Sequence, residues 1–308
     1  MMILWLLVSV VLALLAVSVV FSFLLTRRRK PDETRSPAEY GLAFEEVAFP
    51  ACDGVTLRGW WIPATPVPGP DPLPLSQSDG GRAGDGDLAR AVIFLHGQGG
   101  SMDPDVQYVP ALNAAGFNVL MFDFRAHGRS DGHISTIGYL ERQDALGAVD
   151  FVRSKGIERI GLLGFSMGGI VAMLTAPICP EAKAVISDGG PARLVSATAA
   201  WGIERGVPRW LSAALAWLMI AVTSLRLRAN LFRYEPVRWV GQIAPRPILF
   251  IHGDRDRYTP PADLDALVAA AGQPKELWRV PEAGHRTVDQ LDPEEYRRRV
   301  VAFFSRYL

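Results

Sequence analysis

Two short stretches of the chain fit the pattern Gly-X-Ser-X-Gly, in which a tight turn can present a serine hydroxyl as a nucleophile. They are GRSDG at residues 128–132 and GFSMG at residues 164–168. Because five residues carry little information, the surrounding elements must decide between them. A nucleophilic serine at such a turn needs a strand that enters the turn and a helix that leaves it.

Ser166 has both elements in its neighbourhood. The apolar run RIGLLG precedes it, and GIVAMLTA, which is rich in helix formers, follows it. Gly164 and Gly168 supply the small neighbours that a crowded turn requires. Ser130 is flanked by two charged residues, and no helical pattern follows it. The sequence therefore predicts Ser166 as a nucleophile and Ser130 as part of a loop.

A serine hydroxyl needs a nearby base that accepts its proton. His285 lies in PEAGHR, directly after the last apolar run, from which a loop can reach back over the edge of a sheet. The other histidines end strand-like runs (His96 and His252) or flank Ser130 (His127 and His133). We expect His285 to be the base.

The base in turn needs a carboxylate that holds its tautomer and stabilises its charged form. HGDRDRYTP, at residues 252–260, presents Asp254 and Asp256 just after a strand-like run. The spacing alone leaves both open.

The strands and helices that must position these residues are indicated by apolar runs that alternate with helical segments. Two of the helical segments are 139–154 and 170–176. Continuous runs of strand length are typical of strands covered on both faces. Their alternation with helices predicts an α/β fold with a mostly parallel sheet, right-handed crossovers and helices on both faces. The runs lie at 91–96, 117–123, 159–164, 183–188, 247–252 and 276–281. Before them, residues 44–63 predict a hairpin that turns at Asp53-Gly54.

Two insertions interrupt this pattern. Residues 64–90 are rich in proline, glycine and polar residues, so we expect them to form a disordered insertion. Residues 191–240 are too long for a simple crossover and contain sixteen uncharged residues at 210–225. That run is short for a membrane span, and a second span would place the later strands across the membrane from the earlier ones. We therefore expect a helical cap over the carboxyl edge of the sheet.

The N-terminus predicts a membrane anchor. Residues 3–25 carry no charge, and a helix of 23 residues reaches about 34 Å, enough to cross a bilayer core. Basic residues follow the apolar run at 27–30 and none precede it, which favours an uncleaved single-pass anchor at 1–26. Because basic residues prefer the cytoplasmic side, we expect the N-terminus outside the cytoplasm and the catalytic domain inside it. A signal peptide or a buried core helix is the alternative. A juxtamembrane linker is expected at 27–43 and the catalytic domain at 44–308.

Composition and spacing exclude several other functions. The 32 basic residues equal the 32 acidic residues in number, so charge gives no reason to expect nucleic acid as a partner. Cys52 and Cys179 have no metal-ligand spacing and indicate no disulfide framework. The cluster of Asp123, His127, Asp131 and His133 also fits no known metal site, so we expect a loop there and no metal.

Several short motifs together resemble the α/β-hydrolase family. They are HG at 96–97, DFRAHGRSDG at 123–132, GFSMG at 164–168, the HG-X-X-D spacing that ends at Asp256, and GH at 284–285. The resemblance runs from about residue 44 to residue 308, and the chain order Ser, Asp, His also matches.

The resemblance implies an acid at Asp256, with Asp254 as the alternative and Asp188 as a further one. It also implies an oxyanion loop at HGQGGS (96–101), so that the backbone N–H groups of Gln98 and Met167 would face the developing negative charge. Around Ser130 the family carries a structural loop, from which this chain departs by having Ala126 in place of a glycine.

These features predict a membrane-anchored serine hydrolase that cleaves esters or thioesters through an acyl-enzyme and needs no cofactor. The cap tryptophans Trp201, Trp210 and Trp217 are candidates for contact with an apolar acyl group or the bilayer, although helix packing alone would also explain them. Small esters, lipid esters and acylated proteins all remain possible substrates. A peptidase of the same fold and a non-catalytic binding scaffold are the alternatives. The oligomeric state does not follow from the sequence.

Overall fold

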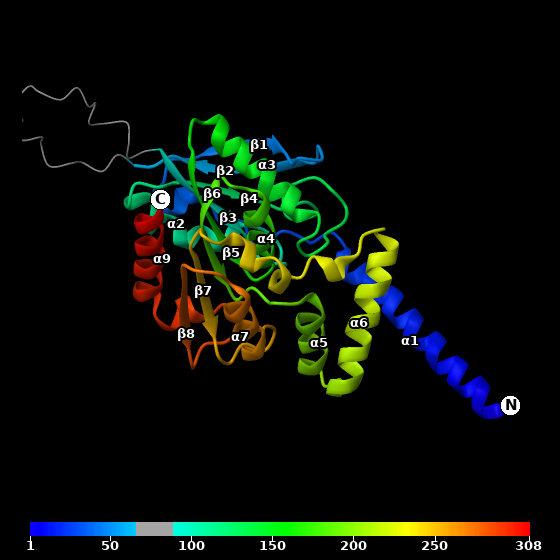
Figure 1. Cartoon of the computed structure of the whole chain (residues 1–308). Coiled ribbons are helices and arrows are strands. Elements are labelled where there is room, and N and C mark those ends of the chain that lie inside the picture. The colour runs from blue at the N-terminus through cyan, green and yellow to red at the C-terminus, as the bar shows by residue number, and fades with distance from the viewer. Residues whose placement is uncertain (66–88) are drawn as a thin grey trace, which may run out of the picture.

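A single sheet forms the centre of the protein, as the computed structural model shows for residues 1–65 and 89–308. Within these residues the sheet has eight strands in the order β1-β2-β4-β3-β5-β6-β7-β8 (Figure 1). The strands are β1 (Glu45–Pro50), β2 (Thr56–Ile62), β3 (Arg90–Leu95), β4 (Asn118–Phe122), β5 (Arg159–Phe165), β6 (Ala182–Asp188), β7 (Ile248–Gly253) and β8 (Lys275–Val280).

The sheet is parallel from β4 to β8, and the hairpin β1-β2 joins it antiparallel at β4. The hairpin turns through Asp53-Gly54, as expected, and Gly54 has a φ of +86° that favours glycine. All six apolar runs of the sequence form strands. Strands β3 to β6 are buried on both faces, whereas β8 is a half-exposed edge strand.

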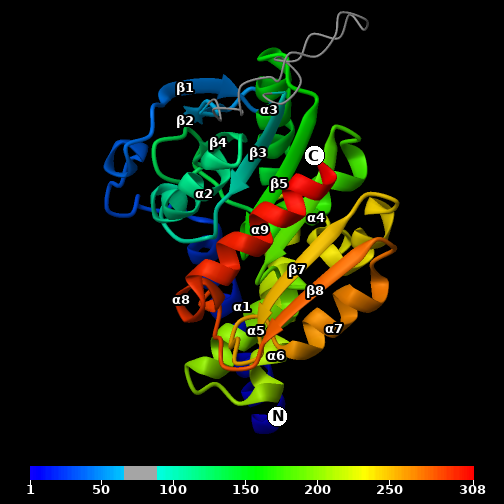
Figure 2. The ribbon, with the colours of Figure 1, turned by 90° about the vertical axis from the view of Figure 1, so that its left-hand side faces the viewer.

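Helices cover both faces of the sheet (Figures 1 and 2). On one face lie α3 (Glu141–Ser154), α4 (Met167–Thr175) and α7 (Pro261–Ala270), and on the other lie α2 (Val109–Ala114) and α9 (Pro293–Tyr307). Each face has its own buried cluster of apolar side chains, because alternate residues of the central strands point to opposite sides. This arrangement confirms the expected fold class. Shorter elements are η1 (Pro37–Tyr40), η2 (Asp103–Tyr108), η3 (Ala176–Ile178) and α8 (Val288–Leu291).

The long segment between β6 and β7 contains two helices. They are α5 (Leu194–Glu204) and α6 (Arg209–Arg226), and α6 coincides with the uncharged run of the sequence. Three short turns of 3₁₀-helix at 231–233, 236–238 and 240–243 lead back to the sheet. Of the insertion that we expected at 64–90, residues 66–88 lie outside the described part of the chain.

The N-terminal helix α1 (Met2–Thr26) is continuous over 25 residues and projects from the domain (Figure 1). Within the described ranges it is the one helix long and apolar enough to cross a membrane, a property that anchors share with signal sequences. Its C-terminal half packs against α6, where the hydroxyl oxygens of Ser22 and Thr223 are hydrogen-bonded at 3.0 Å.

The residues after α1 are held tightly against the domain. The Arg28 guanidinium donates to the carbonyl oxygens of Gly128 and Gly132 at 2.9 and 2.8 Å. The Asp32 carboxylate accepts a hydrogen bond of 2.9 Å from the backbone N–H of Ser101. The first residues of the expected linker at 27–43 therefore hold α1 in a fixed position relative to the sheet.

Candidate active site

Ser166 occupies the sharp turn between the central strand β5 and helix α4. Strand β5 ends at Phe165 and α4 begins at Met167, so a single residue changes the direction of the chain. Ser166 has a φ of +51°, which L-residues rarely adopt, and its N–H donates to the carbonyl oxygen of Asp188 at 2.8 Å. A strained, over-determined backbone of this kind is typical of a functional turn.

The glycines on either side of Ser166 are required by close backbone contacts. A Cβ atom at Gly168 would lie 1.7 Å from the carbonyl oxygen of Leu95. A Cβ atom at Gly164 would lie 2.2 Å from the carbonyl oxygen of Gly168. Strand β3, strand β5 and helix α4 therefore meet too closely for any side chain, and this packing holds Ser166 in place.

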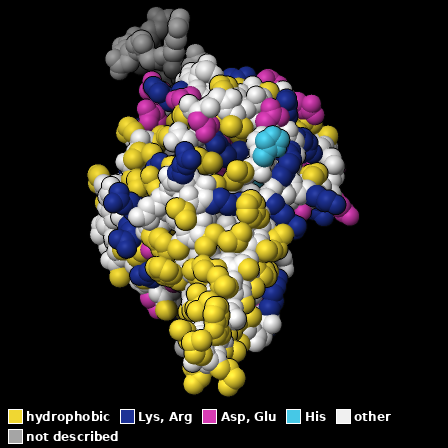
Figure 3. Space-filling view, turned by 90° about the vertical axis from the view of Figure 1, so that its right-hand side faces the viewer, with side chains coloured by type: hydrophobic (Ala, Val, Ile, Leu, Met, Phe, Trp, Pro, Cys, Tyr) yellow, Lys and Arg dark blue, Asp and Glu magenta, His cyan; other side chains and the backbone are white. Residues whose placement is uncertain are grey.

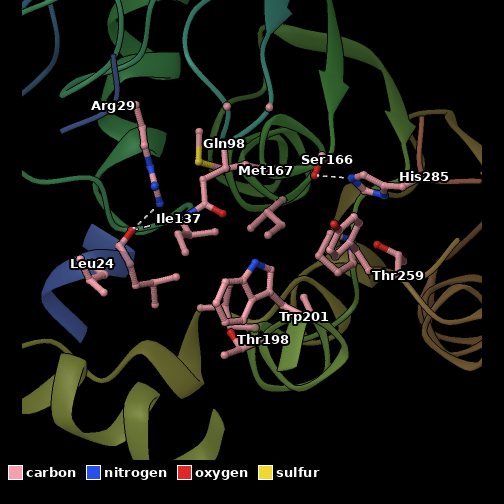
Figure 4. Close-up of a pocket in the computed structure, with 18 of the residues that line it drawn as sticks. Leu24, Arg29, Gln98, Ile137, Ser166, Met167, Thr198, Trp201, Thr259 and His285 are labelled. Atoms are coloured by element: carbon pink, nitrogen blue, oxygen red, sulfur yellow. Dashed lines mark hydrogen bonds between the residues drawn. The ribbon is translucent and has the colours of Figure 1, made fainter. Parts of the chain in front are cut away.

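The structure brings Ser166, His285 and Asp256 together in one chain of hydrogen bonds, of which Figure 4 shows the contact between Ser166 and His285. The Nε2 atom of His285 lies 2.9 Å from the Ser166 Oγ, and its Nδ1 atom lies 2.7 Å from the Asp256 Oδ2. The buried Asp256 carboxylate is held from behind, because its Oδ1 accepts hydrogen bonds of 2.8 Å from the backbone N–H groups of Tyr258 and Thr259.

The other two candidate acids have different partners. Asp254 lies near the surface and forms an ion pair of 2.8 Å with Arg279. Asp188 is buried and accepts a hydrogen bond of 2.8 Å from the Tyr296 hydroxyl. Burial raises the pKa of Asp188 to about 6, although the positive charge of Arg286 opposes this rise. Of the three carboxylates, Asp256 is the one hydrogen-bonded to His285.

A partly buried ion pair that the sequence did not reveal supports the histidine loop. Arg286 directly follows His285 and has a φ of +52°, and its guanidinium donates to Asp105 at 2.7 Å. The same guanidinium lies 4.2 Å from the ring centroid of Phe165, the residue before Ser166. The sequence could have pointed to Arg286, because this residue directly follows His285, but no sequence pattern connects Asp105 with it.

The backbone N–H groups expected to face an oxyanion lie in suitable elements. Met167 is the first residue of α4, where N–H groups have no acceptor within the helix. Gln98 follows β3, and both residues line the pocket beside Ser166. His96 holds this loop in place, because its Nε2 accepts from the N–H of Phe124 at 2.9 Å. Burial lowers the pKa of His96, so the ring is neutral and able to accept this bond.

Ser130 is a buried residue of a structural loop. Its hydroxyl donates to the carbonyl oxygen of Asp123 at 2.5 Å and accepts from the N–H of Arg58 at 2.8 Å. Ala126, where the family pattern has glycine, keeps the left-handed turn with a φ of +56°. The Asp123 carboxylate accepts from the N–H groups of Met102 and Arg129, both at 2.8 Å.

The remaining residues of that loop give no indication of a metal site. Across residues 1–65 and 89–308, no group of three or more His, Cys, Asp or Glu side chains is arranged to hold a metal ion. Two of the four residues, Asp131 and His133, are exposed, and the Asp123 carboxylate is held by backbone N–H groups. His127 contacts the carbonyl oxygen of Arg125 through Nδ1 at 2.8 Å.

A pocket of about 760 Å³ adjoins Ser166 and His285 (Figure 4). Trp201 of the cap lies in its wall, whereas Trp210 and Trp217 lie on the outer side of α6 and do not line it. An unexpected part of the wall comes from α1 and the residues after it. Apolar lining residues outside the catalytic loops include Phe21, Leu24, Leu25, Ile137, Ile170, Leu194 and Met219.

This arrangement has the parts that nucleophilic acyl transfer needs. It has a hydroxyl within hydrogen-bond distance of an imidazole, a carboxylate that orients the imidazole, and N–H groups at a helix start. The adjoining pocket is mostly apolar and suits an acyl chain or another hydrophobic group.

Comparisons with known proteins agree with this fold. Residues 92–299 match the family described as the Alpha/beta hydrolase family. The uncharacterized protein YfhR of Salmonella typhimurium is 30% identical over 251 residues, which cover 78% of this chain and 74% of that protein. The uncharacterized protein YqkD of Bacillus subtilis is 25% identical over 316 residues, which cover 96% of this chain and 95% of that protein.

Among solved structures, a crystal form of the esterase Pf2001 of Pyrococcus furiosus superposes with a TM-score of 0.69. The two chains are 26% identical, and the match covers 91% of this chain and 98% of the esterase. An esterase of Exiguobacterium antarcticum, at 16% identity and a TM-score of 0.59, shares the fold.

Proposed function

Because this chain belongs to the alpha/beta hydrolase family, we propose that it is a serine hydrolase that cleaves carboxylic ester or thioester bonds through an acyl-enzyme. The observation that carries the proposal is the hydrogen-bonded chain from Ser166 through His285 to Asp256. The similarity to Pf2001 of Pyrococcus furiosus, which is described as an esterase, supports the ester as the bond that is cleaved.

In the proposed mechanism the Ser166 Oγ attacks the carbonyl carbon of the substrate, and its proton passes to Nε2 of His285. Asp256 accepts the hydrogen bond from Nδ1–H and stabilises the imidazolium that forms. The N–H groups of Gln98 and Met167 stabilise the negatively charged oxygen of the tetrahedral intermediate. The alcohol or thiol leaves with the proton from His285, and water, activated by the same base, then releases the acid.

The proposal includes the arrangement of the chain in the membrane. Residues 1–26, which contain α1, are a single-pass anchor, residues 27–43 connect it to the hydrolase domain at 44–308, and residues 191–240 form a cap over the site. Four basic residues at 27–30 favour a cytoplasmic hydrolase domain, because basic residues are enriched on that side of a span.

A fluorophosphonate probe tests the nucleophile, because it reacts with an activated serine hydroxyl. We expect the full-length protein to be labelled, the Ser166→Ala variant to lose all labelling, and the Ser130→Ala variant to retain it. Folding of each variant is checked by thermal unfolding. Labelling that disappears only in Ser130→Ala contradicts the assignment, and a folded wild-type protein without labelling indicates a non-catalytic scaffold.

A further inference from the structure

Helix α1 forms part of the active-site wall. Phe21, Leu24 and Leu25 line the pocket, and Gln98 of the expected oxyanion loop donates from its side chain to the carbonyl oxygen of Leu25 at 3.4 Å. The pocket is therefore bounded by the last turns of the helix proposed to cross the membrane. Because such a helix leaves the bilayer near its charged end, the pocket must lie at the membrane surface.

The length of α1 places the cap at the membrane as well. Among the described side chains of α1, Leu14 is the first that is partly buried and Ser18 is the first that is buried, so at most residues 2–17 project beyond the domain. Sixteen helical residues span about 24 Å, whereas the hydrocarbon core is about 30 Å thick. The core must therefore extend along α1 past Ser18, to the level at which α1 packs against α6.

Specific contacts fix the cap at this level. The Ser22–Thr223 hydrogen bond joins α1 to α6, and the Arg226 guanidinium donates to the carbonyl oxygen of Ser22 at 3.1 Å and to the Thr26 hydroxyl. The ring of Phe21 contacts Trp201 of α5 edge to face, with centroids 6.1 Å apart. The cap and the proposed anchor therefore form one packed unit.

The outer surface of this unit is suited to a bilayer interface. Trp201, Trp210, Trp217 and Leu225, here called the cap face, are 41, 75, 57 and 82% exposed. Hydrophobic side chains gather over the lower part of this side of the molecule, and Lys and Arg side chains border them (Figure 3). Tryptophan is enriched where one end of the ring meets lipid and the other meets water.

The charge around the cap face complements anionic lipid headgroups. Residues 191–240 contain seven arginines and two glutamates, and four further basic residues follow α1 at 27–30. Arg27, Arg28, Arg205, Arg209 and Arg228 are exposed. A surplus of basic residues beside an apolar surface favours binding to the anionic leaflet of a membrane.

We propose that the cap face rests in the membrane interface beside α1, and that the substrate is a lipid ester of the same leaflet. This inference rests on the proposed hydrolase function. The pocket opens toward the lipid, because Phe21 and Leu24 of α1 and Trp201 of the cap face are all part of its lining and all exposed. An acyl chain can pass along these side chains to Ser166. Its ester C–O bond is cleaved, the acyl group is transferred to Ser166, and the lipid alcohol leaves with the proton from His285.

The experiment compares two substrates on the full-length protein in vesicles of phosphatidylcholine and phosphatidylglycerol. One is a fluorogenic diacyl phospholipid in the bilayer, and the other is the soluble ester p-nitrophenyl butyrate. We expect hydrolysis of both. In Trp210→Glu the lipid rate should fall at least about tenfold, because a charge is costly at the interface, whereas the soluble rate should change less than about twofold. The matched control Ile178→Glu alters an apolar side chain that is 46% exposed after α4, at the end remote from Ser166, and should leave both rates unchanged.

The outcomes separate this inference from the proposed function. Hydrolysis of the soluble ester without hydrolysis of the phospholipid overturns the lipid inference and leaves the hydrolase intact. Cleavage of an S-acylated peptide in place of the phospholipid overturns it in favour of an acyl-protein substrate. An unchanged lipid rate in Trp210→Glu shows that the cap face has no role in lipid binding. A folded protein that hydrolyses neither ester and resists the fluorophosphonate overturns both proposals.

Discussion

Asp256 is the residue whose substitution tests the hydrogen-bonded chain most directly. In Asp256→Asn the amide cannot stabilise the imidazolium and favours the wrong tautomer of His285, so we expect kcat to fall by about 10³ to 10⁴. Asp254→Asn and Asp188→Asn remove carboxylates whose partners are Arg279 and Tyr296, and kcat should fall less than about tenfold in each. Kinetics with a soluble ester give the measurement. A loss in Asp188→Asn as large as that in Asp256→Asn contradicts the assignment.

The same residues show what could be predicted from the sequence at this scale. Ser166 and His285 were identified because each directly follows a strand-like run, and chain order then limited the acid to a few carboxylates. The spacing of the residues alone did not decide between Asp254 and Asp256, because side-chain direction in a loop depends on backbone turns, and only the family resemblance favoured Asp256. The Arg286–Asp105 pair was also invisible, since its members lie 181 residues apart.

At the scale of elements, the turn between β5 and α4 depends on the missing side chain of Gly168. An alanine Cβ there would collide with the carbonyl oxygen of Leu95, a backbone atom that cannot move without shifting β3. We expect Gly168→Ala to destabilise the protein by about 3 kcal/mol or more and to abolish fluorophosphonate labelling. Thermal unfolding and labelling provide the two measurements.

Gly99 provides the matched control, because it lies in the neighbouring loop and a Cβ atom there meets nothing within 4 Å. Gly99→Ala should change stability by less than about 0.5 kcal/mol and retain labelling. If Gly168→Ala were as stable and as reactive as Gly99→Ala, the turn would not depend on this close approach.

The elements were predictable where their patterns are local. Both faces of the central strands are covered, so continuous apolar runs marked β3 to β7, and the run at 276–281 also marked the half-exposed edge strand β8. The packing of α1 against α6 was not predicted, although Ser18, Ser22 and Thr26 recur every four residues in an otherwise apolar helix. Small polar residues at this spacing allow helices to approach closely, as in membrane bundles. Their partner Thr223 is 201 residues away from Ser22, and no local pattern identifies it.

At the scale of the whole molecule, if α1 is the proposed membrane anchor, its attachment to the hydrolase domain gives that domain a fixed orientation toward one membrane surface. Arg28 and Asp32 fasten the segment after α1 to loops beside the active site. Arg28, one of the basic residues that favour the cytoplasmic side, is therefore also in contact with the domain. The sidedness of the domain follows from how α1 inserts, and the natural cysteines allow it to be measured.

Cys52 is exposed near the β1-β2 hairpin and Cys179 is buried, and both are free. A membrane-impermeant maleimide should therefore label the protein at Cys52 only from the side on which the hydrolase domain lies. We expect labelling in sealed vesicles with the cytoplasmic face outward, and none in sealed vesicles of the opposite orientation until detergent is added. Cys52→Ser should lose the labelling, which shows that Cys179 does not contribute. Labelling in the opposite orientation without detergent would place the domain outside the cytoplasm, because the reagent cannot cross the bilayer.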